Sequence, residues 1–457
     1  MKVLDTAPPS VSTVVTQRVS NAVQRYLPDP FVIAIGLTVV VFAMAMLIEG
    51  TGPIETVRLW GEGLWTLLSF SMQVTVLLLT GYMLANTPVV QRLLDGMSSR
   101  VTDPRVAVAL ACFIGLLGAW FNAGLGMVLG TIIAQRLACH VRGMHFPLAV
   151  AGGYAGFCIY GIGVSGTVPL SIATPGHPLE PLMGVAPLSA TVFHPVMLGT
   201  SILVAIALPL FVALLHPRTP ELVTEADPAT LPAPAGAADA GPRPEWFSDR
   251  LSHSRAPGWV MGLIGLTYSV VYVADGGAIN FDSINALFLF LCLLLYGRPV
   301  LFLKSLREST PMISAVLVQY PMYAGIMGIM GILAGSGLMI TFAGVFVATS
   351  SAETLPFFSF ISGGVINILA PSTGAQWAIQ GPVMVEAAQQ MGADIAATSM
   401  GVAMGDQWTN AIQPLWILPA LAISGIKLRD AMIYLLYISV FLGVIYGGAM
   451  LLWGFTA

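Results

Sequence analysis

The chain has 457 residues, of which 56% are hydrophobic and only 9% are charged. A soluble domain carries about 25% charged residues, so this composition excludes a soluble globular protein and predicts an all-α polytopic membrane protein. The formal net charge of −4 gives no indication of a nucleic-acid partner.

In chain order, the first predicted element is an N-terminal amphipathic segment, residues 1–27, which would lie on the membrane surface. Apolar runs that can span a bilayer, about 20 residues each, follow it. They lie near residues 30–49, 63–86, 147–171, 190–215, 258–275, 311–335, 395–424 and 431–455, with a shorter run at 283–297. The Pro-rich, charged stretch 217–257 predicts a solvated linker between two halves.

Two further apolar stretches, 106–139 and 354–391, are interrupted in the middle. The first is broken at WFNAGLG (120–126) and the second at NILAPSTG (367–374). Because each arm is shorter than a full span, we expect both to be re-entrant helical hairpins. The alternative is two ordinary spanning helices in each stretch.

The positions of the basic residues support this layout. If the N-terminus is cytoplasmic and each hairpin returns to its own side, all 18 Lys and Arg residues except Arg58 fall on the cytoplasmic side. Cytoplasmic loops of membrane proteins carry an excess of Lys and Arg. The distribution therefore favours both the orientation and the hairpins.

The two halves also share an order of elements. One shift along the sequence brings Asn122 onto Asn367 and Pro169 onto Pro414. The single extra span at 258–275 would insert the second copy upside down, which is the inverted repeat of many secondary transporters. The predicted units are a first repeat at 28–216, a cytoplasmic linker at 217–257, a connecting transmembrane helix at 258–275 and a second repeat at 283–457.

Each half supplies a hairpin tip and a broken spanning helix, and these four segments are the predicted site. Broken helices in lipid are tolerated where the freed groups face protein, water or a ligand, and half-helix N-termini attract anions. The candidate substrate-binding residues are Asn122, Gly124, Ser165, Gly166, Thr167, Asn367, Ser372, Thr373, Gly374, Trp377, Trp408, Thr409 and Asn410. For any one of them the alternative is structural, because Gly and Pro are frequent in membrane helices and Ser and Thr often bond to their own helix.

Asp406 lies deep within the apolar 395–424 run. An ionisable group in the membrane interior is costly and by default marks an ion or proton path, so we expect Asp406, with Gln407 and Gln413, to hold a coupling H⁺ or Na⁺. The alternative is a carboxylate that caps a broken helix. No Lys or Arg is predicted in the membrane interior, so hydroxyl, amide and backbone N–H groups would hold an anionic substrate. No His or Cys spacing suits a metal, and we expect no other cofactor.

An enzyme was considered because Gly163 to Gly166 read GVSG, the nucleophile motif of rhomboid intramembrane proteases. Such a serine needs a histidine on a later membrane helix to activate it. The last histidine is His253, in the linker. We therefore expect no enzymatic activity.

The broken segments resemble those of a known family. The stretches RYLPDPFVIAIGLTVV (25–40), GVSGTVPLSIATPGHP (163–178), PSTGAQWAIQGP (371–382) and MGDQWTNAIQPLWILPALAISG (404–425) resemble the short-chain fatty acid transporter family of the AtoE type, within the ion transporter superfamily. The resemblance implies a secondary carrier of short-chain monocarboxylates such as butyrate or acetoacetate in the bacterial cytoplasmic membrane. It also implies cation symport, a homodimer and an elevator motion of the domain that holds both hairpins.

Two alternatives to a coupled monocarboxylate carrier remain. One is a passive channel or facilitator for small organic anions, and the other is a di- or tricarboxylate carrier of the same superfamily. Asp406 distinguishes the first, because a coupled carrier needs an ion-binding group and a pore does not.

Overall fold

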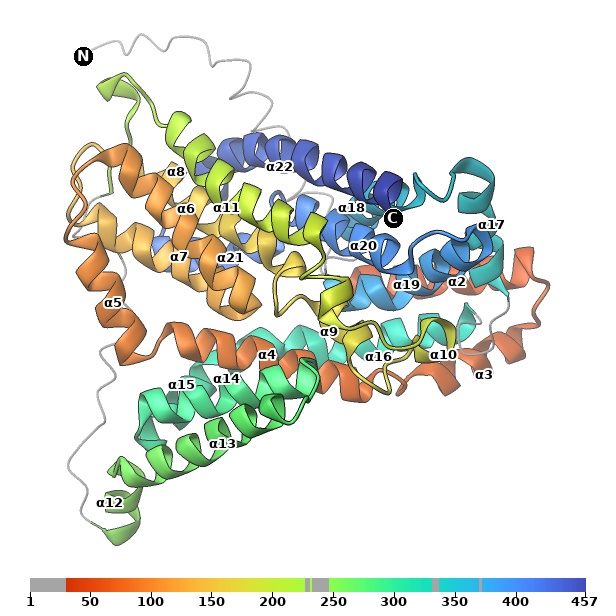
Figure 1. Cartoon of the computed structure of the whole chain (residues 1–457), viewed down its shortest axis with the longest axis horizontal. Helices are drawn as coiled ribbons and strands as arrows, with labels where there is room; N and C mark the ends of the chain where they lie inside the picture. Colours follow the sequence, from red (N-terminus) through yellow and green to blue (C-terminus); the bar gives the residue numbers. More distant parts are fainter. Residues whose placement is uncertain (1–29, 227–230, 232–245, 331–336, 370–371) are drawn as a thin grey trace, which may run out of the picture.

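The computed structural model describes residues 30–226, 231, 246–330, 337–369 and 372–457 (Figure 1). In this part of the chain all regular secondary structure is helical. Six of its helical segments are long and apolar enough to cross a membrane. The predicted amphipathic segment 1–27 lies outside the described residues, as does much of the linker.

One group of helices, which we call body A, lies along the lower side of Figure 1. Within it α4 packs against α14, and α16 packs against α2 and α3. Body A comprises α2 (Pro30–Ile48), α3 (Pro53–Gly63), α4 (Leu68–Ala85), α13 (Ala256–Ala274), α14 (Phe281–Tyr296), α15 (Pro299–Ser309), η4 (Thr310–Ile313) and α16 (Ser314–Ile329).

The second group, body B, contains every segment predicted to form the site. Its two most extensive contacts are between α18 and α20 and between α6 and α7. Body B comprises α6 (Pro104–Phe121), α7 (Ala123–Ala138), α8 (Phe146–Ala155), η1 (Gly156–Ile162), α9 (Thr167–Ala173), α11 (Pro195–Leu214), α18 (Leu355–Leu369), α19 (Thr373–Met391), α20 (Ile395–Asn410), α21 (Pro414–Ser424) and α22 (Leu428–Thr456).

Shorter helices connect or border the two bodies. α5 (Pro88–Ser98) contacts α7, while α17 (Leu338–Thr349) and the short α10 (Glu180–Met183) contact α19. The remaining short elements are η2 (Leu188–Ala190), η3 (Pro220–Leu222) and α12 (Phe247–His253). Four of the helices, α3, α5, α15 and α17, are not apparent in the hydropathy pattern, because each has only 11 or 12 residues and is shorter than a membrane span.

Both interrupted apolar stretches consist of two helices. α6 and α7 meet at Asn122, whose extended backbone (φ −156°, ψ 128°) ends one helix and begins the next. α19 begins after Ser372, which is extended in the same way (φ −156°, ψ 112°). The breaks at WFNAGLG and NILAPSTG therefore fall at helix ends.

Both predicted broken helices are broken. After α8 the chain continues as the 3₁₀ helix η1, leaves helical conformation at 163–166 and resumes as α9. α20 ends at Asn410 and the chain resumes as α21 at Pro414. Proline lacks the N–H that a continuous helix would need and is favoured in a first turn, which accounts for the restart at Pro414.

Glycines allow α6, α7 and α8 to pack with their backbones in contact. A Cβ added to Gly153 would overlap the carbonyl oxygen of Gly130 and lie 2.5 Å from its carbonyl carbon. A Cβ on Gly115 would overlap the carbonyl oxygen of Gly153. Small residues that let membrane helices approach closely are a common packing device, and here they join the α6–α7 pair to the broken helix α8.

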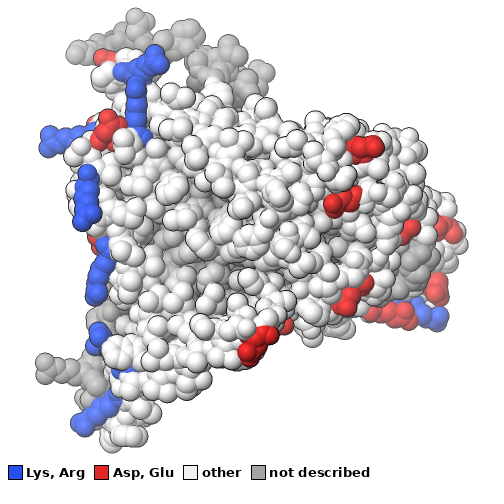
Figure 2. Space-filling view, viewed as in Figure 1, with Lys and Arg blue, Asp and Glu red and all other residues white. Residues whose placement is uncertain are grey.

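The basic residues gather along one edge of the molecule. Figure 2 shows Lys and Arg at the left edge, while most of the acidic side chains on this face lie towards the opposite end. Arg58, which the sequence analysis placed apart from the others, pairs with Glu55 at 3.3 Å.

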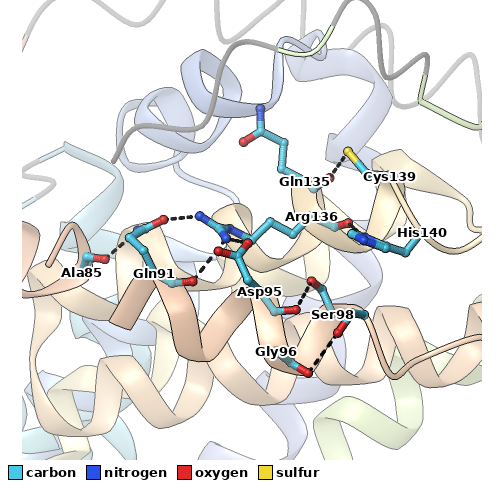
Figure 3. Close-up of polar contacts among 10 residues, drawn as sticks. Ala85, Gln91, Asp95, Gly96, Ser98, Gln135, Arg136, Cys139 and His140 are labelled. Carbon is cyan, nitrogen blue, oxygen red and sulfur yellow. Dashed lines mark hydrogen bonds and ion pairs between the residues drawn. The ribbon is translucent and has the colours of Figure 1, made fainter. Parts of the chain in front are cut away.

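At the basic edge, Arg136 joins α7 to α5 (Figure 3). Its guanidinium pairs with Asp95, bonds to the side chain of Gln91 and donates to the Gln91 carbonyl oxygen at 3.2 Å. Gln91 in turn donates to the carbonyl oxygen of Ala85, at the end of α4, at 2.8 Å. The Arg136 side chain is only 10% exposed, so this polar cluster fixes one end of the contact between the two bodies.

A second polar cluster at this edge surrounds His145, which precedes α8. Its Nδ1 accepts the N–H of Thr224 at 2.9 Å, and its Nε2 lies 2.7 Å from the hydroxyl of Tyr434. The backbone N–H of His145 donates to Nε2 of His216 at 3.1 Å. Because Nδ1 of His145 accepts a bond, the ring is neutral and carries its proton on Nε2.

This arrangement predicts a loss of stability in acid. Burial, and then the neighbouring His216, lowers the pKa of His145 from 6.5 to about 4. The stabilisation from the neutral ring is therefore fully present above pH 6.5, the pKa of histidine in the unfolded chain. It is lost as the pH falls from that value through about 4, the pKa in the folded protein. Thermal unfolding in detergent from pH 7.5 to 4.5 should show a smaller pH dependence for His145→Gln than for the unmodified protein. Equal pH dependence in the two proteins would contradict this.

Candidate functional site

The site is built around Asp406, which is fully buried on α20. Its Oδ2 accepts hydrogen bonds from the hydroxyl of Thr373 and the amide of Gln407, both at 2.6 Å, and from the amide of Asn410 at 2.9 Å. Its Oδ1 is buried and has no hydrogen-bond partner among the described residues. The carboxylate thus has one saturated oxygen and one that is open to a proton or a small cation.

Asn367, near the end of α18, ties the two sides of the break in α20–α21 together. Its amide nitrogen donates to the backbone carbonyl oxygen of Asp406 and to Thr409 Oγ1, both at 2.9 Å, and to Asn410 Oδ1 at 2.8 Å. Gln413 donates to the Asn367 carbonyl oxygen at 3.1 Å. The side-chain oxygens of Asn367 and Gln407 are buried without a partner among the described residues, so acceptor atoms are in excess around the carboxylate.

The start of α19 lies beside this carboxylate. Thr373, which donates to Asp406, is also hydrogen-bonded to the hydroxyl of Tyr160 from η1. The preceding residue, Ser372, makes no side-chain cap to α19 and instead lies 3.3 Å from the hydroxyl of Tyr320 on α16. The first N–H groups of a helix have no partner within the helix, and Ser372 gives those of α19 no side-chain cap.

The start of α7 differs. Asn122 Oδ1 accepts the N–H of Leu125 and Ser165 Oγ accepts the N–H of Ala123, both at 3.1 Å. The Asn122 amide donates to the Leu77 carbonyl oxygen on α4 at 3.2 Å. Two of the first donors of this helix, the N–H groups of Ala123 and Leu125, are therefore occupied by predicted site residues.

Three further predicted residues, Thr167, Gly166 and Gly124, lie at close contacts between helices. Thr167 is buried at the start of α9 and is hydrogen-bonded to the Tyr160 hydroxyl. Gly166 lies against Gly161, and Gly124 lies against the α4 carbonyl oxygen of Leu78, both too close for a Cβ. Thr167 and Gly166 therefore lie at the break before α9, and Gly124 lies at the contact with body A.

The two tryptophans differ in their surroundings. Trp377 is buried on α19, at the tip that contains Gly374. Trp408 donates to the Ser439 carbonyl oxygen at 2.9 Å, and its ring centroid lies 5.0 Å from that of Phe360. The Trp408 ring therefore packs between α18 and α22 and does not reach the carboxylate cluster.

Sequence reasoning missed Tyr160 and Tyr320, whose hydroxyl groups contact Thr373 and Ser372. Tyrosine was counted among the apolar residues, so neither of the two interrupts an apolar run. The nearest signal was the position of Tyr160, six residues before the predicted Gly166 and next to the break.

Hydrogen bonds connect all four predicted segments. The series Tyr160–Thr373–Asp406 links the first broken helix, the α19 tip and the second broken helix. The α7 tip joins the first broken helix separately, through Ser165. The residues of this series and those that bond to Asp406 include no basic side chain, so the carboxylate is the charged group of the cluster.

A polytopic helical fold with two broken helices around a buried carboxylate is that of a membrane transporter. Two solved transporters have a similar overall fold. The YdaH transporter of Alcanivorax borkumensis superposes with a TM-score of 0.65 at 16% sequence identity, over 93% of this chain and 98% of that one. MtrF of Neisseria gonorrhoeae does so with a TM-score of 0.58 at 16% identity, over 95% and 97% of the two chains. At this identity the likeness concerns the fold alone.

Sequence comparison identifies the family. The family described as Short chain fatty acid transporter matches residues 11–453. Relatives that bear the same family name are 35% identical over 433 residues in Escherichia coli and 32% identical over 427 residues in Haemophilus influenzae. They cover 94% and 92% of this chain and 98% and 94% of their own. The chain belongs to the short-chain fatty acid transporter family, a family of transporters and not of enzymes.

Proposed function

We propose that this protein is a secondary active transporter of short-chain monocarboxylates, such as butyrate and acetoacetate, coupled to H⁺ or Na⁺. The observation that carries the proposal is the buried Asp406 carboxylate, with one free oxygen, beside the uncapped start of α19. A passive pore does not require an ion-binding group, whereas a coupled carrier does, and burying a carboxylate in the membrane is costly.

The substrate carboxylate binds at the start of α19, at Ser372, Thr373 and Gly374. The N-terminus of a helix offers free N–H donors and the positive end of the helix dipole. At the start of α7, Ser165 and Asn122 already accept the N–H groups of Ala123 and Leu125, which favours the α19 tip. Thr167, Thr409 and Asn410 hold the broken helices in place around it.

The coupling cation binds at Asp406 Oδ1, with the free oxygens of Gln407 and Asn367 as neighbouring acceptors. Thr373 bonds directly to Asp406 and lies at the tip that receives the substrate. Two negative charges roughly 6 Å apart repel by about 3 kcal/mol at an effective dielectric constant of about 20. A bound cation removes this repulsion, so each ligand favours the other.

The division into two bodies supports a mechanism of alternating access. Body B holds both interrupted helix pairs, which act as re-entrant hairpins, and both broken helices of an inverted repeat. Its contacts with body A include close backbone packing, as at Gly124, and hydrogen bonds such as Asn122 to Leu77, Phe281 to Thr174 and Tyr320 to Ser372. Body B moves as an elevator against body A, which forms the homodimer in the bacterial inner membrane, with the basic edge and the N-terminus in the cytoplasm.

Uptake into proteoliposomes tests the proposal. Labelled butyrate and acetoacetate should accumulate above their external concentration under either an inward proton gradient or an inward Na⁺ gradient. Equilibration without accumulation under both gradients would instead indicate a facilitator. Stronger inhibition by succinate or citrate than by butyrate would indicate a di- or tricarboxylate carrier.

A further inference from the structure

Two aromatic rings of body A face the tip of α19. Phe70 on α4 and Tyr320 on α16 are stacked, with ring centroids 5.9 Å apart and an angle of 22° between the ring planes. Phe70 also contacts the edge of Phe281 on α14, at 5.8 Å. Phe70 is 6% exposed and Tyr320 is 3% exposed, so three helices of body A hold this aromatic pair in a fixed position.

The tip of α19 is closed against this pair. A Cβ on Gly374 would overlap the hydroxyl oxygen of Tyr320 and lie 3.0 Å from a ring carbon of Phe70. The Tyr320 hydroxyl also lies 3.3 Å from Ser372 Oγ. Glycine at 374 is therefore what allows the helix start to touch the rings.

The tip is held from both bodies, and the two contacts are not equivalent. Thr373 bonds to Tyr160, which belongs to body B together with α19. Ser372 and Gly374 contact Tyr320, which belongs to body A. When body B moves, the first contact can persist and the second has to open. The aromatic pair is therefore the surface that the tip leaves when substrate is admitted.

Resting on the proposed function, we propose that Phe70 and Tyr320 determine the acyl-chain length of the substrate. With the carboxylate on the N–H groups of α19, the acyl chain extends from the tip towards this pair, which contacts the tip at Gly374. Each methylene buried there contributes about 0.8 kcal/mol, or roughly fourfold in affinity. Because three helices hold the two rings in place, the rings cannot move aside, and an acyl chain that is too long would clash with them.

The first test enlarges the space beside the aromatic pair by shortening the side chain of Phe70. The measurement is uptake of acetate, butyrate and hexanoate by proteoliposomes. In Phe70→Ala, kcat/KM for hexanoate divided by kcat/KM for butyrate should rise about tenfold or more. The milder Phe70→Leu should raise it roughly threefold and serves if the alanine variant does not fold. Tyr323→Phe is the control, because Tyr323 is a fully buried tyrosine on α16, the helix that carries Tyr320, and its hydroxyl has no partner among the described residues. Its ratio should not change.

The second test narrows the space and then restores it. Gly374→Ala should lower butyrate uptake more than acetate uptake, because the added methyl group and the rings compete for the same volume. Adding Tyr320→Phe removes the oxygen atom that this methyl group would overlap and should recover part of the butyrate uptake. Adding Tyr323→Phe should recover none.

The outcomes separate the two proposals. If the unmodified protein transports none of the three carboxylates under any gradient, the proposed function and this inference both fail. If it transports butyrate and a folded Phe70 variant keeps the same length profile, the inference alone fails. Equal loss of all three substrates in Gly374→Ala, without recovery by Tyr320→Phe, would also overturn it.

Discussion

Asp406→Asn is expected to abolish the accumulation of butyrate against its gradient. Asparagine has the same shape and keeps an oxygen to accept the bonds from Thr373, Gln407 and Asn410, but its neutral amide neither takes up a proton nor supplies a charge for Na⁺. Removal of a coupling charge worth about 3 kcal/mol corresponds to a loss of roughly 100-fold in gradient-driven accumulation. Exchange of labelled for unlabelled butyrate should persist, because the substrate no longer meets a negative charge.

The matched control lies on the same helix. Asp394 caps the start of α20 by accepting the N–H of Ala397 at 2.8 Å, and asparagine is an equally good N-terminal cap. Asp394→Asn should therefore accumulate butyrate like the unmodified protein. Gradient-driven accumulation that survives Asp406→Asn would show that the coupling ion binds elsewhere.

Gly153→Ala is expected to have the largest effect on stability. The added methyl group would overlap the backbone of Gly130, and backbone inside a packed helix pair cannot move aside as a flexible side chain can. Overpacking of a core costs about 1–3 kcal/mol, occasionally more, and a backbone clash belongs at the upper end. Thermal unfolding in detergent should show a marked decrease in the midpoint temperature and a reduced yield of folded protein.

Gly199→Ala is the control for this prediction. Gly199 lies inside α11, and no atom lies within 4 Å of the position of an added Cβ. Alanine is favoured over glycine in a helix interior by about 1 kcal/mol, so this variant should be as stable as the unmodified protein or slightly more stable. Equal midpoints for the two variants would mean that the α7–α8 contact is not tightly packed.

The sequence alone determined the class of protein, the approximate positions of its apolar helices and the four places where helices end or break. These features follow from local properties, namely hydropathy, the lack of an N–H in proline and the low side-chain volume of glycine. It also identified Asp406, because placing an ionisable side chain inside the membrane is energetically costly, so a single acid in a long apolar run stands out. The family match confirms the resemblance that these segments carried.

The tertiary structure decided which of these groups act together. Tyr160 meets Thr373 across 213 positions, and Tyr320 meets Ser372 across 52, and no local pattern reports contacts of this kind. The structure also decided that side chains accept two of the N–H groups at the α7 tip, while those of α19 have no side-chain cap. It decided as well that Trp408 packs away from the carboxylate. The physical reason is that hydropathy fixes where a segment lies, whereas the pairing of donors and acceptors depends on how separate helices pack.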